Sequence, residues 1–315
     1  MYFYLYTKLF LKNPEVMNSF SKQTRRNFIG DLSVFTAAAL FPGSTLLSCR
    51  NLPGPKMKLG LVTYLWAKDW DIPTIIGNCT EANIPGVELR VEHAHGVTLD
   101  LSRQQREEVR KQFAGSAVEI IGMGTNEQYD WPDPERLKQS IDTTKAWLQL
   151  SKDIGGSGVK VKPNQFHEGI PQAKTLEQIG KALNELGRYA LNMGQQIRLE
   201  VHGVGTQELP NIAKIMEYVE NVGSTVCWNS NSEDLNEPGL EFNFNLVKDY
   251  FGDICHVREL NLGDYPYQQL MNLFVRMDYK GWILLECRTD PEDKVAALKE
   301  QREVFEKMIK NAQNL

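Results

Sequence analysis

Residues 197–203 read Ile-Arg-Leu-Glu-Val-His-Gly, a short run in which apolar and polar side chains alternate. Successive residues of a β-strand point to opposite faces, so the aliphatic residues share one face and Arg198, Glu200 and His202 share the other. A helical pattern over residues 210–219 follows the run. A strand with one charged face that leads into an amphipathic helix indicates an α/β protein built on a parallel sheet.

The same alternation of strand and helix occurs eight times from Lys58 onward. The predicted strands cover residues 58–66, 86–90, 119–125, 158–163, 197–203, 225–231, 253–260 and 282–288. The predicted helices, marked by apolar residues three and four positions apart, cover residues 72–83, 102–113, 134–154, 176–193, 210–219, 245–251, 267–277 and 293–312. Eight strand–helix units that close on themselves predict a (β/α)8 barrel, or TIM barrel, over residues 58–315. An open doubly wound sheet is the alternative, but no glycine-rich dinucleotide turn follows the first strand.

The composition is that of an ordinary soluble protein with enough residues for such a barrel. The chain has 315 residues, of which 42% are hydrophobic and 24% charged, and a formal net charge of −5. A mildly acidic chain offers no basic stripe for nucleic acid, so we expect no nucleic-acid partner. The five cysteines form no Cys-x-x-Cys pair, which argues against a thiolate zinc cluster.

The N-terminal segment has the order of features found in an export signal. Residues 24–30 read Thr-Arg-Arg-Asn-Phe-Ile-Gly, an apolar stretch covers residues 34–47, and Cys49 follows Leu-Leu-Ser. This order resembles a twin-arginine export signal that runs into a bacterial lipoprotein cleavage site, where Cys49 would become the acylated N-terminus. We therefore predict a signal over residues 1–49, a short tether over residues 50–57, and an exported protein that is periplasmic or anchored to the membrane by lipid. An uncleaved anchor is the alternative.

Polar side chains concentrate late in the predicted strands, at the rim where barrel enzymes place their chemistry. They are Glu88 and Arg90, Lys160 and Lys162, Glu200 and His202, Asn229, His256 and Arg258, and Glu286. Because the apolar face of each strand meets the helices, we expect these groups to point into the lumen. A structural salt-bridge network would explain one or two pairs, whereas polar residues on at least five strands favour a binding or catalytic site.

All five histidines lie at or beyond the C-terminal ends of predicted strands. His202 and His256 are predicted to face the lumen, whereas His93 and His95 belong either to the site or to loop structure. His167 follows the fourth strand. The side chains predicted to contact a substrate are Glu88, Arg90, His95, Lys162, His202 and Arg258.

Five short motifs, one per strand–helix unit, carry a resemblance to a known family. They are Gly86–Arg90 (Gly-Val-Glu-Leu-Arg), Leu199–Gly203 (Leu-Glu-Val-His-Gly), Cys227–Asn229 (Cys-Trp-Asn), His256–Arg258 (His-Val-Arg) and Leu285–Glu286. In this order and spacing they resemble the sugar phosphate isomerase/epimerase family, the xylose isomerase-like barrels, over residues 58–311. The resemblance implies a TIM barrel that acts on a small sugar.

The resemblance also implies a metal centre, because the family holds a divalent metal with Glu, Asp, His and Glu side chains from strands five to eight. Carried over, these positions are Glu200, Asn229, His256 and Glu286, and the expected cofactor is a divalent metal such as Mn, Mg or Zn. Asn229 stands where the Asp is expected and offers a weaker oxygen ligand. If the ligand is the second His of His-x-His-x-x-Asp, Arg258 replaces it and cannot ligate. A metal-free site charged by Arg258 or Lys162 is therefore the alternative.

For the reaction, the resemblance implies an isomerase or epimerase that moves a proton next to a carbonyl, with Glu200 and Glu286 as the catalytic pair. We expect these two carboxylates to face each other across the lumen with the sugar between them. Export favours a non-phosphorylated or oxidised sugar over a phosphorylated cytoplasmic metabolite. Two other functions use the same residues: a sugar lyase or dehydratase, and a lipoprotein that binds sugars after losing its metal and its catalytic activity.

The export prediction is tested by changing Arg25 and Arg26 to lysine. Because the twin-arginine route reads the arginine pair, the double variant should accumulate as unprocessed precursor in the cytoplasm. As a control, Cys49→Ala should carry no lipid. The measurement is cell fractionation combined with metabolic labelling of the lipid. Normal processing and lipidation of the double-lysine variant would contradict the prediction.

Overall fold

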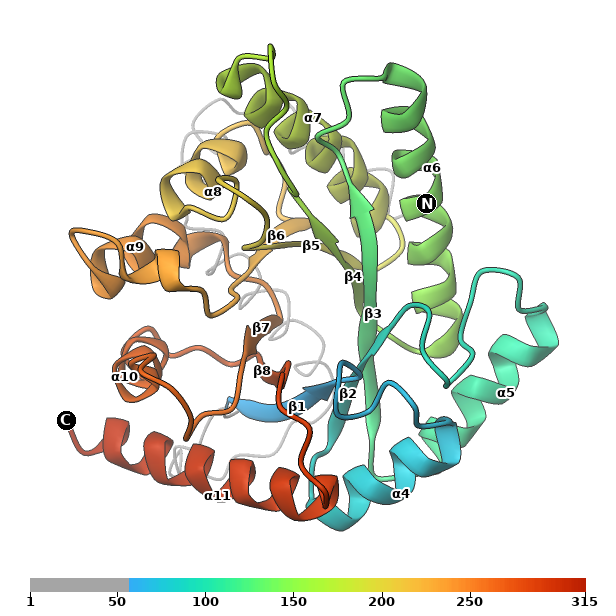
Figure 1. Cartoon of the computed structure of the whole chain (residues 1–315). Helices are drawn as coiled ribbons and strands as arrows, with labels where there is room; N and C mark the ends of the chain where they lie inside the picture. The colour runs from blue at the N-terminus through green and yellow to red at the C-terminus, as the bar shows by residue number, and fades with distance from the viewer. Residues whose placement is uncertain (1–56) are drawn as a thin grey trace, which may run out of the picture. The chain divides into compact units, whose positions relative to one another are not determined.

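Eight parallel strands form the centre of the part of the chain that the structure, a computed structural model, describes, residues 57–315 (Figure 1). The strands are β1 (Lys58–Val62), β2 (Gly86–Arg90), β3 (Glu119–Gln128), β4 (Gly158–Lys162), β5 (Gln196–Glu200), β6 (Ser224–Cys227), β7 (Ile254–Val257) and β8 (Trp282–Leu285). Their order in the sheet is β6-β5-β4-β3-β2-β1-β8-β7. Between β6 and β7 the ring is joined by the isolated bridges Val226↔Phe251 and Asn229↔His256 rather than by a continuous ladder. The predicted (β/α)8 barrel is confirmed.

Helices alternate with the strands along the described chain and pack around the outside of the sheet (Figure 1). They are α4 (Ile72–Ala82), α5 (Arg103–Ala114), α6 (Pro134–Ile154), α7 (Gln172–Leu191), α8 (Leu209–Met216), α9 (Leu240–Val247), α10 (Tyr267–Arg276) and α11 (Lys294–Gln313), with short 3-10 turns η1 (Ser232–Leu235) and η2 (Lys248–Tyr250). Within residues 57–315, none of these helices combines the length and the apolar character that crossing a bilayer requires. The predicted signal, the predicted acylation site Cys49 and nearly all of the predicted tether lie outside the described residues.

Capping side chains explain where several helices begin. The N-caps of α4, α5, α6 and α11 are Asp71, Ser102, Asp133 and Asp293. Each side chain accepts a hydrogen bond from a backbone N–H of the first helical turn, a group that has no partner within the helix. At the other end of α6, Gly155 adopts a left-handed conformation with φ of 97°, which ends the helix and returns the chain to β4.

Several predicted strands were too long, and the predicted bounds of one helix were wrong. β1 ends at Val62 rather than at Trp66, because the residues beyond it leave the ladder and form a loop at the rim. The prediction of a helix over residues 245–251 is wrong in its bounds, since α9 ends at Val247. Phe251, which contributed to that helical pattern, packs instead into an aromatic cluster with Trp228.

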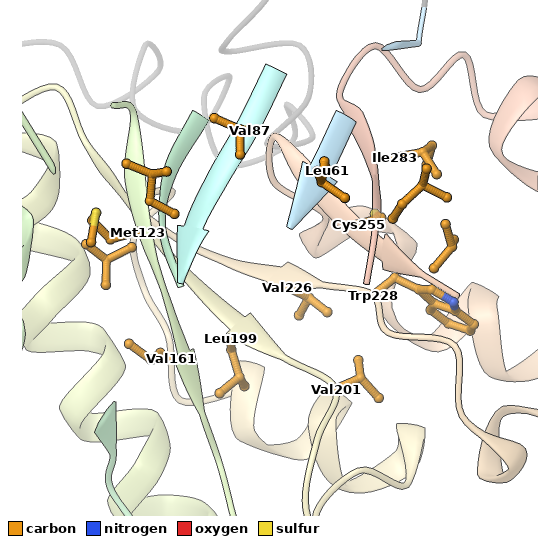
Figure 2. Close-up of a cluster of buried hydrophobic side chains, with 14 of the residues drawn as sticks. Leu61, Val87, Met123, Val161, Leu199, Val201, Val226, Trp228, Cys255 and Ile283 are labelled. Carbon is orange, nitrogen blue, oxygen red and sulfur yellow. The ribbon is translucent and has the colours of Figure 1, made fainter. Parts of the chain in front are cut away.

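The two faces of the barrel strands pack against different apolar layers. The outer faces meet the helices in one large core; Figure 2 labels Leu61, Val87, Met123, Val161, Leu199, Val201, Val226, Trp228, Cys255 and Ile283 from it. A smaller cluster comprises Val62, Ile121, Cys227, Ile254, Trp282 and Leu284. Ile254 and Leu284 precede His256 and Glu286 by two residues and so share their strand faces. Ile254 and Leu284 therefore lie below these charged groups in the lumen, whereas Val62 and Cys227 lie level with Glu88 and Glu200 in the sheet.

Gly158, the first residue of β4, leaves no room for a side chain. A Cβ there would lie 2.6 Å from the carbonyl oxygen of Gln196 and 2.9 Å from the guanidinium of Arg198. A Cβ on Gly77, in an exposed part of α4, would meet no atom within 4 Å.

We expect Gly158→Ala to lower the free energy of unfolding by about 1–3 kcal/mol through overpacking. Gly77→Ala should raise it by about 0.5–1 kcal/mol, because alanine restricts the unfolded chain and favours the helix. Denaturant unfolding of the two variants measures both effects. A Gly158→Ala protein as stable as the wild type would show that the barrel does not pack as closely as described.

Candidate active site

Glu200, the last residue of β5, has partners on both carboxylate oxygens. Lys160 Nζ, from β4, donates to Oε2 at 2.8 Å, and Asn229 Nδ2, from the segment after β6, donates to Oε1 at 2.9 Å. The side chains of Lys160 and Glu200 are each 1% exposed. Burial opposes ionisation, but the charges of Lys160 and His256 hold the pKa of the Glu200 carboxyl well below its usual range. Glu200 is therefore an ionised carboxylate with a buried counter-charge.

His256, on β7, lies between two buried carboxylates. Its Nδ1 is 3.3 Å from Glu200 Oε1, and its Nε2 is 3.3 Å from Glu88 Oε1. Burial alone lowers the pKa of an imidazole, but the Cys227 side chain together with the carboxylates of Glu88 and Glu200 raises the pKa of His256 well above its ordinary value. Glu88 shows the converse: burial raises the pKa of its carboxyl, but His256 and Lys160 lower it below the ordinary value. The deep charges of the lumen thus stabilise one another.

Glu286, immediately after β8, differs from these groups. Its backbone N–H donates to the carbonyl of Val257 at 2.7 Å, which fixes the residue beside β7. Its carboxylate, on a residue that is 6% exposed, has no hydrogen-bond or ion-pair partner among the described residues. Burial and the negative charge of Glu200 raise the pKa of the Glu286 carboxyl. The site therefore contains two carboxyl groups with opposite tendencies, one held ionised and one favouring its proton.

Glu200, His256 and Glu286 form a possible metal site. Each offers one ligand atom, and these atoms lie within 4.8 Å of one another. Asn229 Oδ1 is buried and accepts no hydrogen bond from residues 57–315, so a fourth donor atom lies next to Glu200. Carboxylate, amide and imidazole donors together suit Mn²⁺ or Zn²⁺, provided that His256 loses its proton, because only the neutral ring binds metal. The donor set fits a divalent ion.

The two glutamates lie closer together than expected. A sugar carbon flanked by both carboxylates, each at about 3–3.5 Å, needs oxygens roughly 6–7 Å apart. The ligand atoms that Glu200 and Glu286 offer lie within 4.8 Å. The lumen of an eight-stranded barrel is only wide enough to be filled by side chains, so residues on nearly opposite strands meet in its centre. These two atoms are therefore too close together for a sugar carbon to lie between them.

Other residues predicted to contact a substrate lie at the mouth. Arg90 Nη2 and Lys162 Nζ both donate to Asn126 Oδ1, at 3.2 and 3.0 Å. Arg258 Nη2 is 3.5 Å from Asn231 Oδ1, so its guanidinium lies beside the segment after β6. All three cations are half-buried, which leaves part of each side chain open to a ligand.

The predicted histidines have separate roles. His202 is half-buried, its Nδ1 has no hydrogen-bond partner, and burial lowers its pKa. His95 is fully engaged: its Nε2 donates to the carbonyl of Arg90 at 2.7 Å, and its Nδ1 accepts from the N–H of Val97 at 3.1 Å. This geometry leaves no ring nitrogen for a ligand and speaks against the predicted substrate contact of His95. The ring instead positions the backbone of Arg90.

Sequence reasoning missed three groups at this end of the barrel. Lys160 was predicted to face the lumen but was not assigned to the site. A lysine on the lumen face of one strand, next to a strand with a glutamate on the same face, was the available signal of an ion pair. Asn126, near the end of β3, belongs to none of the five motifs, so the sequence offered no signal for it. Asp130 and His167, on the loops after β3 and β4, form a pair with Nε2 2.8 Å from Oδ2; the position of His167 just past a strand was the available signal.

Comparisons with known proteins agree with the observed fold. A sequence model of the xylose isomerase-like TIM barrel family matches residues 76–308. No curated protein matches the chain significantly. Among solved structures, L-ribulose 3-epimerase has a TM-score of 0.70 at 13% identity, covering 82% of this chain and 96% of that chain.

Two further structures are similar in fold. A 3-keto-D-glucoside 4-epimerase from E. coli has a TM-score of 0.67 at 15% identity, covering 80% of this chain and 100% of that chain. The IolI protein, whose structure holds a zinc atom, has a TM-score of 0.67 at 13% identity, covering 81% and 99%. At these identities the likeness shows a shared fold. Because the family match runs from α4 into α11 and includes every site residue from Glu88 to Glu286, the chain belongs to the xylose isomerase-like TIM barrel family.

Proposed function

We propose that the protein is an isomerase or epimerase that transfers a proton next to the carbonyl of a small non-phosphorylated or oxidised sugar. The observation that carries the proposal is the meeting of two buried carboxyl groups, Glu200 and Glu286, in unlike environments. Two carboxyl groups whose pKa values are pushed apart supply a base and an acid at the same pH. The epimerases among the similar structures support this class of reaction.

In the proposed mechanism, Glu200 takes the proton from the carbon next to the carbonyl, and Glu286 delivers a proton to the resulting enediolate. Among the described residues, Glu200 Oε2 accepts a hydrogen bond only from Lys160, so a lone pair remains for the substrate proton. Lys160 also fixes the orientation of that carboxylate. His202 lies two residues beyond Glu200 on the same face, where its ring is in position to bond a sugar hydroxyl near the mouth.

The proposal includes a divalent ion held by Glu200, His256 and Glu286, with Asn229 Oδ1 as a further donor. When bound, such an ion polarises the oxygens of a sugar carbonyl and hydroxyl as a Lewis acid. In a metal-free site, Lys162 or Arg258 would supply positive charge at the mouth instead. The chain's own residues thus offer two ways to stabilise an enediolate.

One observation favours a second candidate, a sugar-binding protein without catalytic activity. Asn229 is neutral and donates to Glu200, and Lys160 neutralises the same carboxylate. Glu200 is therefore satisfied without a metal ion, as expected of a site that no longer requires one. Elimination of a β-hydroxyl by the same residues would make the protein a lyase, which analysis of the reaction products separates from an isomerase.

We also propose that this reaction takes place outside the cytoplasm, on a lipoprotein attached through Cys49. The order of the arginine pair, the apolar stretch and Cys49 in the sequence supports the location.

The proton-transfer mechanism is tested by Glu200→Gln and Glu286→Gln. Each variant should slow exchange of the substrate α-proton with D2O by about 10²-fold or more, because each removes a general acid or base. The measurement is NMR of a ketose or sugar acid that the wild type exchanges. Glu303→Gln, on an exposed position of α11, is the matched control and should exchange at the wild-type rate. Wild-type exchange in both site variants would rule out the two-carboxylate mechanism.

The metal site is tested by titrating the chelator-treated protein with Mn²⁺ or Zn²⁺ in a calorimeter. We expect one ion per chain, and a loss of affinity of at least tenfold in Glu286→Gln, since an amide is a weaker ligand than a carboxylate. Glu303→Gln should bind as the wild type does. Failure of the wild type to bind either ion would leave the metal-free form of the site.

A further inference from the structure

Three cations at the mouth, Arg90, Lys162 and Arg258, have no carboxylate within ion-pair distance among the described residues. Deeper in the lumen the pattern is different: Lys160 is 2.8 Å from Glu200, and Arg198 is 3.5 Å from Asp253. Among the described residues, these deep cations therefore have acidic partners, whereas the three at the mouth have none within ion-pair distance.

Arg90 and Lys162 converge on one point. Both donate to Oδ1 of Asn126, an exposed residue of β3, over 3.2 and 3.0 Å. β3 lies between β2 and β4 in the sheet, so three neighbouring strands bring the three side chains together. A guanidinium has five N–H groups and an ammonium three, so a single neutral acceptor leaves most of their donors unused.

The protein fixes Arg90 and leaves one of its donors unsatisfied. The backbone N–H of Arg90 donates to Thr63 Oγ1 at 2.8 Å, and its carbonyl accepts from His95 at 2.7 Å. The guanidinium lies 5.5 Å from the centre of the Tyr64 ring. Nε of Arg90 is buried without an acceptor, and a buried donor without a partner is unfavourable.

Lys162 also has no ion-pair partner among the described residues, and Glu200 and Glu286 act on its charge only at longer range. Burial and the neighbouring charge of Lys160 lower the pKa of its ammonium to about 8. An anion bound beside Lys162 would offset both effects.

We propose that Arg90, Lys162 and Asn126 form a subsite for an oxyanion group on the sugar: a carboxylate or a sulfate ester. The inference rests on the proposed function and narrows its substrate to an anionic sugar. An adjacent guanidinium and ammonium match the oxygens of such a group through charge-assisted hydrogen bonds. Asn126 can turn its amide to donate as well, because the amide carries both donors and an acceptor.

The position of this subsite suits the reaction. Arg90 and Lys162 lie two residues beyond Glu88 and Lys160 on the same strand faces, which places them about 6–7 Å nearer the mouth. An acidic group bound there would direct the carbons of the sugar down toward the carboxyl of Glu286. The subsite would thus orient the substrate without taking part in proton transfer.

The test is calorimetric titration of the full chain at neutral pH with D-glucose, D-glucuronate and D-glucose 6-sulfate. We expect at least one anionic probe to bind about tenfold or more tightly than glucose, because it gains hydrogen bonds to charged groups. Arg90→Met and Lys162→Met should each lower the affinity for that anionic probe by about tenfold to hundredfold and leave the affinity for glucose unchanged. Arg103→Met and Lys307→Met, which remove exposed charges from α5 and α11, are the matched controls.

Lys162→Gln, which keeps the length and polarity of the side chain, repeats the test if a methionine variant does not fold. Selective loss of the anionic probe supports the subsite, and the tightest probe identifies the acidic group. The proposed subsite is overturned if glucose and every anionic probe bind with equal affinity. It is also overturned if the variants lose as much affinity for glucose as for the anionic probes. Since binding needs no turnover, a protein with anion selectivity but no proton exchange would contradict the proposed reaction alone.

Discussion

The ionised carboxylate of Glu200 is the buried charge on which the arrangement of the lumen depends. An isolated carboxylate in a protein interior is unfavourable by several kcal/mol unless hydrogen bonds and an opposite charge compensate for it. Lys160, Asn229 and His256 supply that compensation from the two strands beside β5 and from β7. The same partners hold the carboxylate in one orientation and keep it available as a base. The stability of the barrel interior and its chemistry therefore rest on the same contacts.

Asn229 has two opposite consequences for this arrangement. A carboxylate at this position would bring a second negative charge to Glu200, and the resident cations would have to compensate for both. The neutral amide instead donates to Glu200 Oε1 and leaves its own Oδ1 without a partner. The asparagine thus stabilises the lumen in the absence of an ion and weakens the ligand set for one. The carboxylate of Glu286 has no hydrogen-bond donor beside it among the described residues, so it is the carboxyl group free to bind a substrate.

Strand periodicity was enough to predict the barrel and the lumen face, because alternation along a strand is a local property. It placed Glu200 and Glu286 in the lumen, and both are buried there. Strand periodicity could not predict which side chains contact one another across the lumen. The approach of the two glutamates depends on the width of the closed ring, and the backbone bonds of His95 depend on how the loop after β2 folds. The bounds predicted for the helix over residues 245–251 were wrong at its end, because the ring of Phe251 packs against Trp228 instead of continuing the helix.

The unlike ionisation of Glu200 and Glu286 is tested most directly by NMR of their side-chain carboxyl carbons as the pH of metal-free protein is lowered. Spectra of Glu200→Gln and Glu286→Gln assign the two signals. We predict that Glu286 takes up its proton above the ordinary carboxyl pKa of 4.5, whereas Glu200 stays ionised well below that value. If both signals instead shift together near the ordinary value, the lumen does not separate an acid from a base and the account is contradicted.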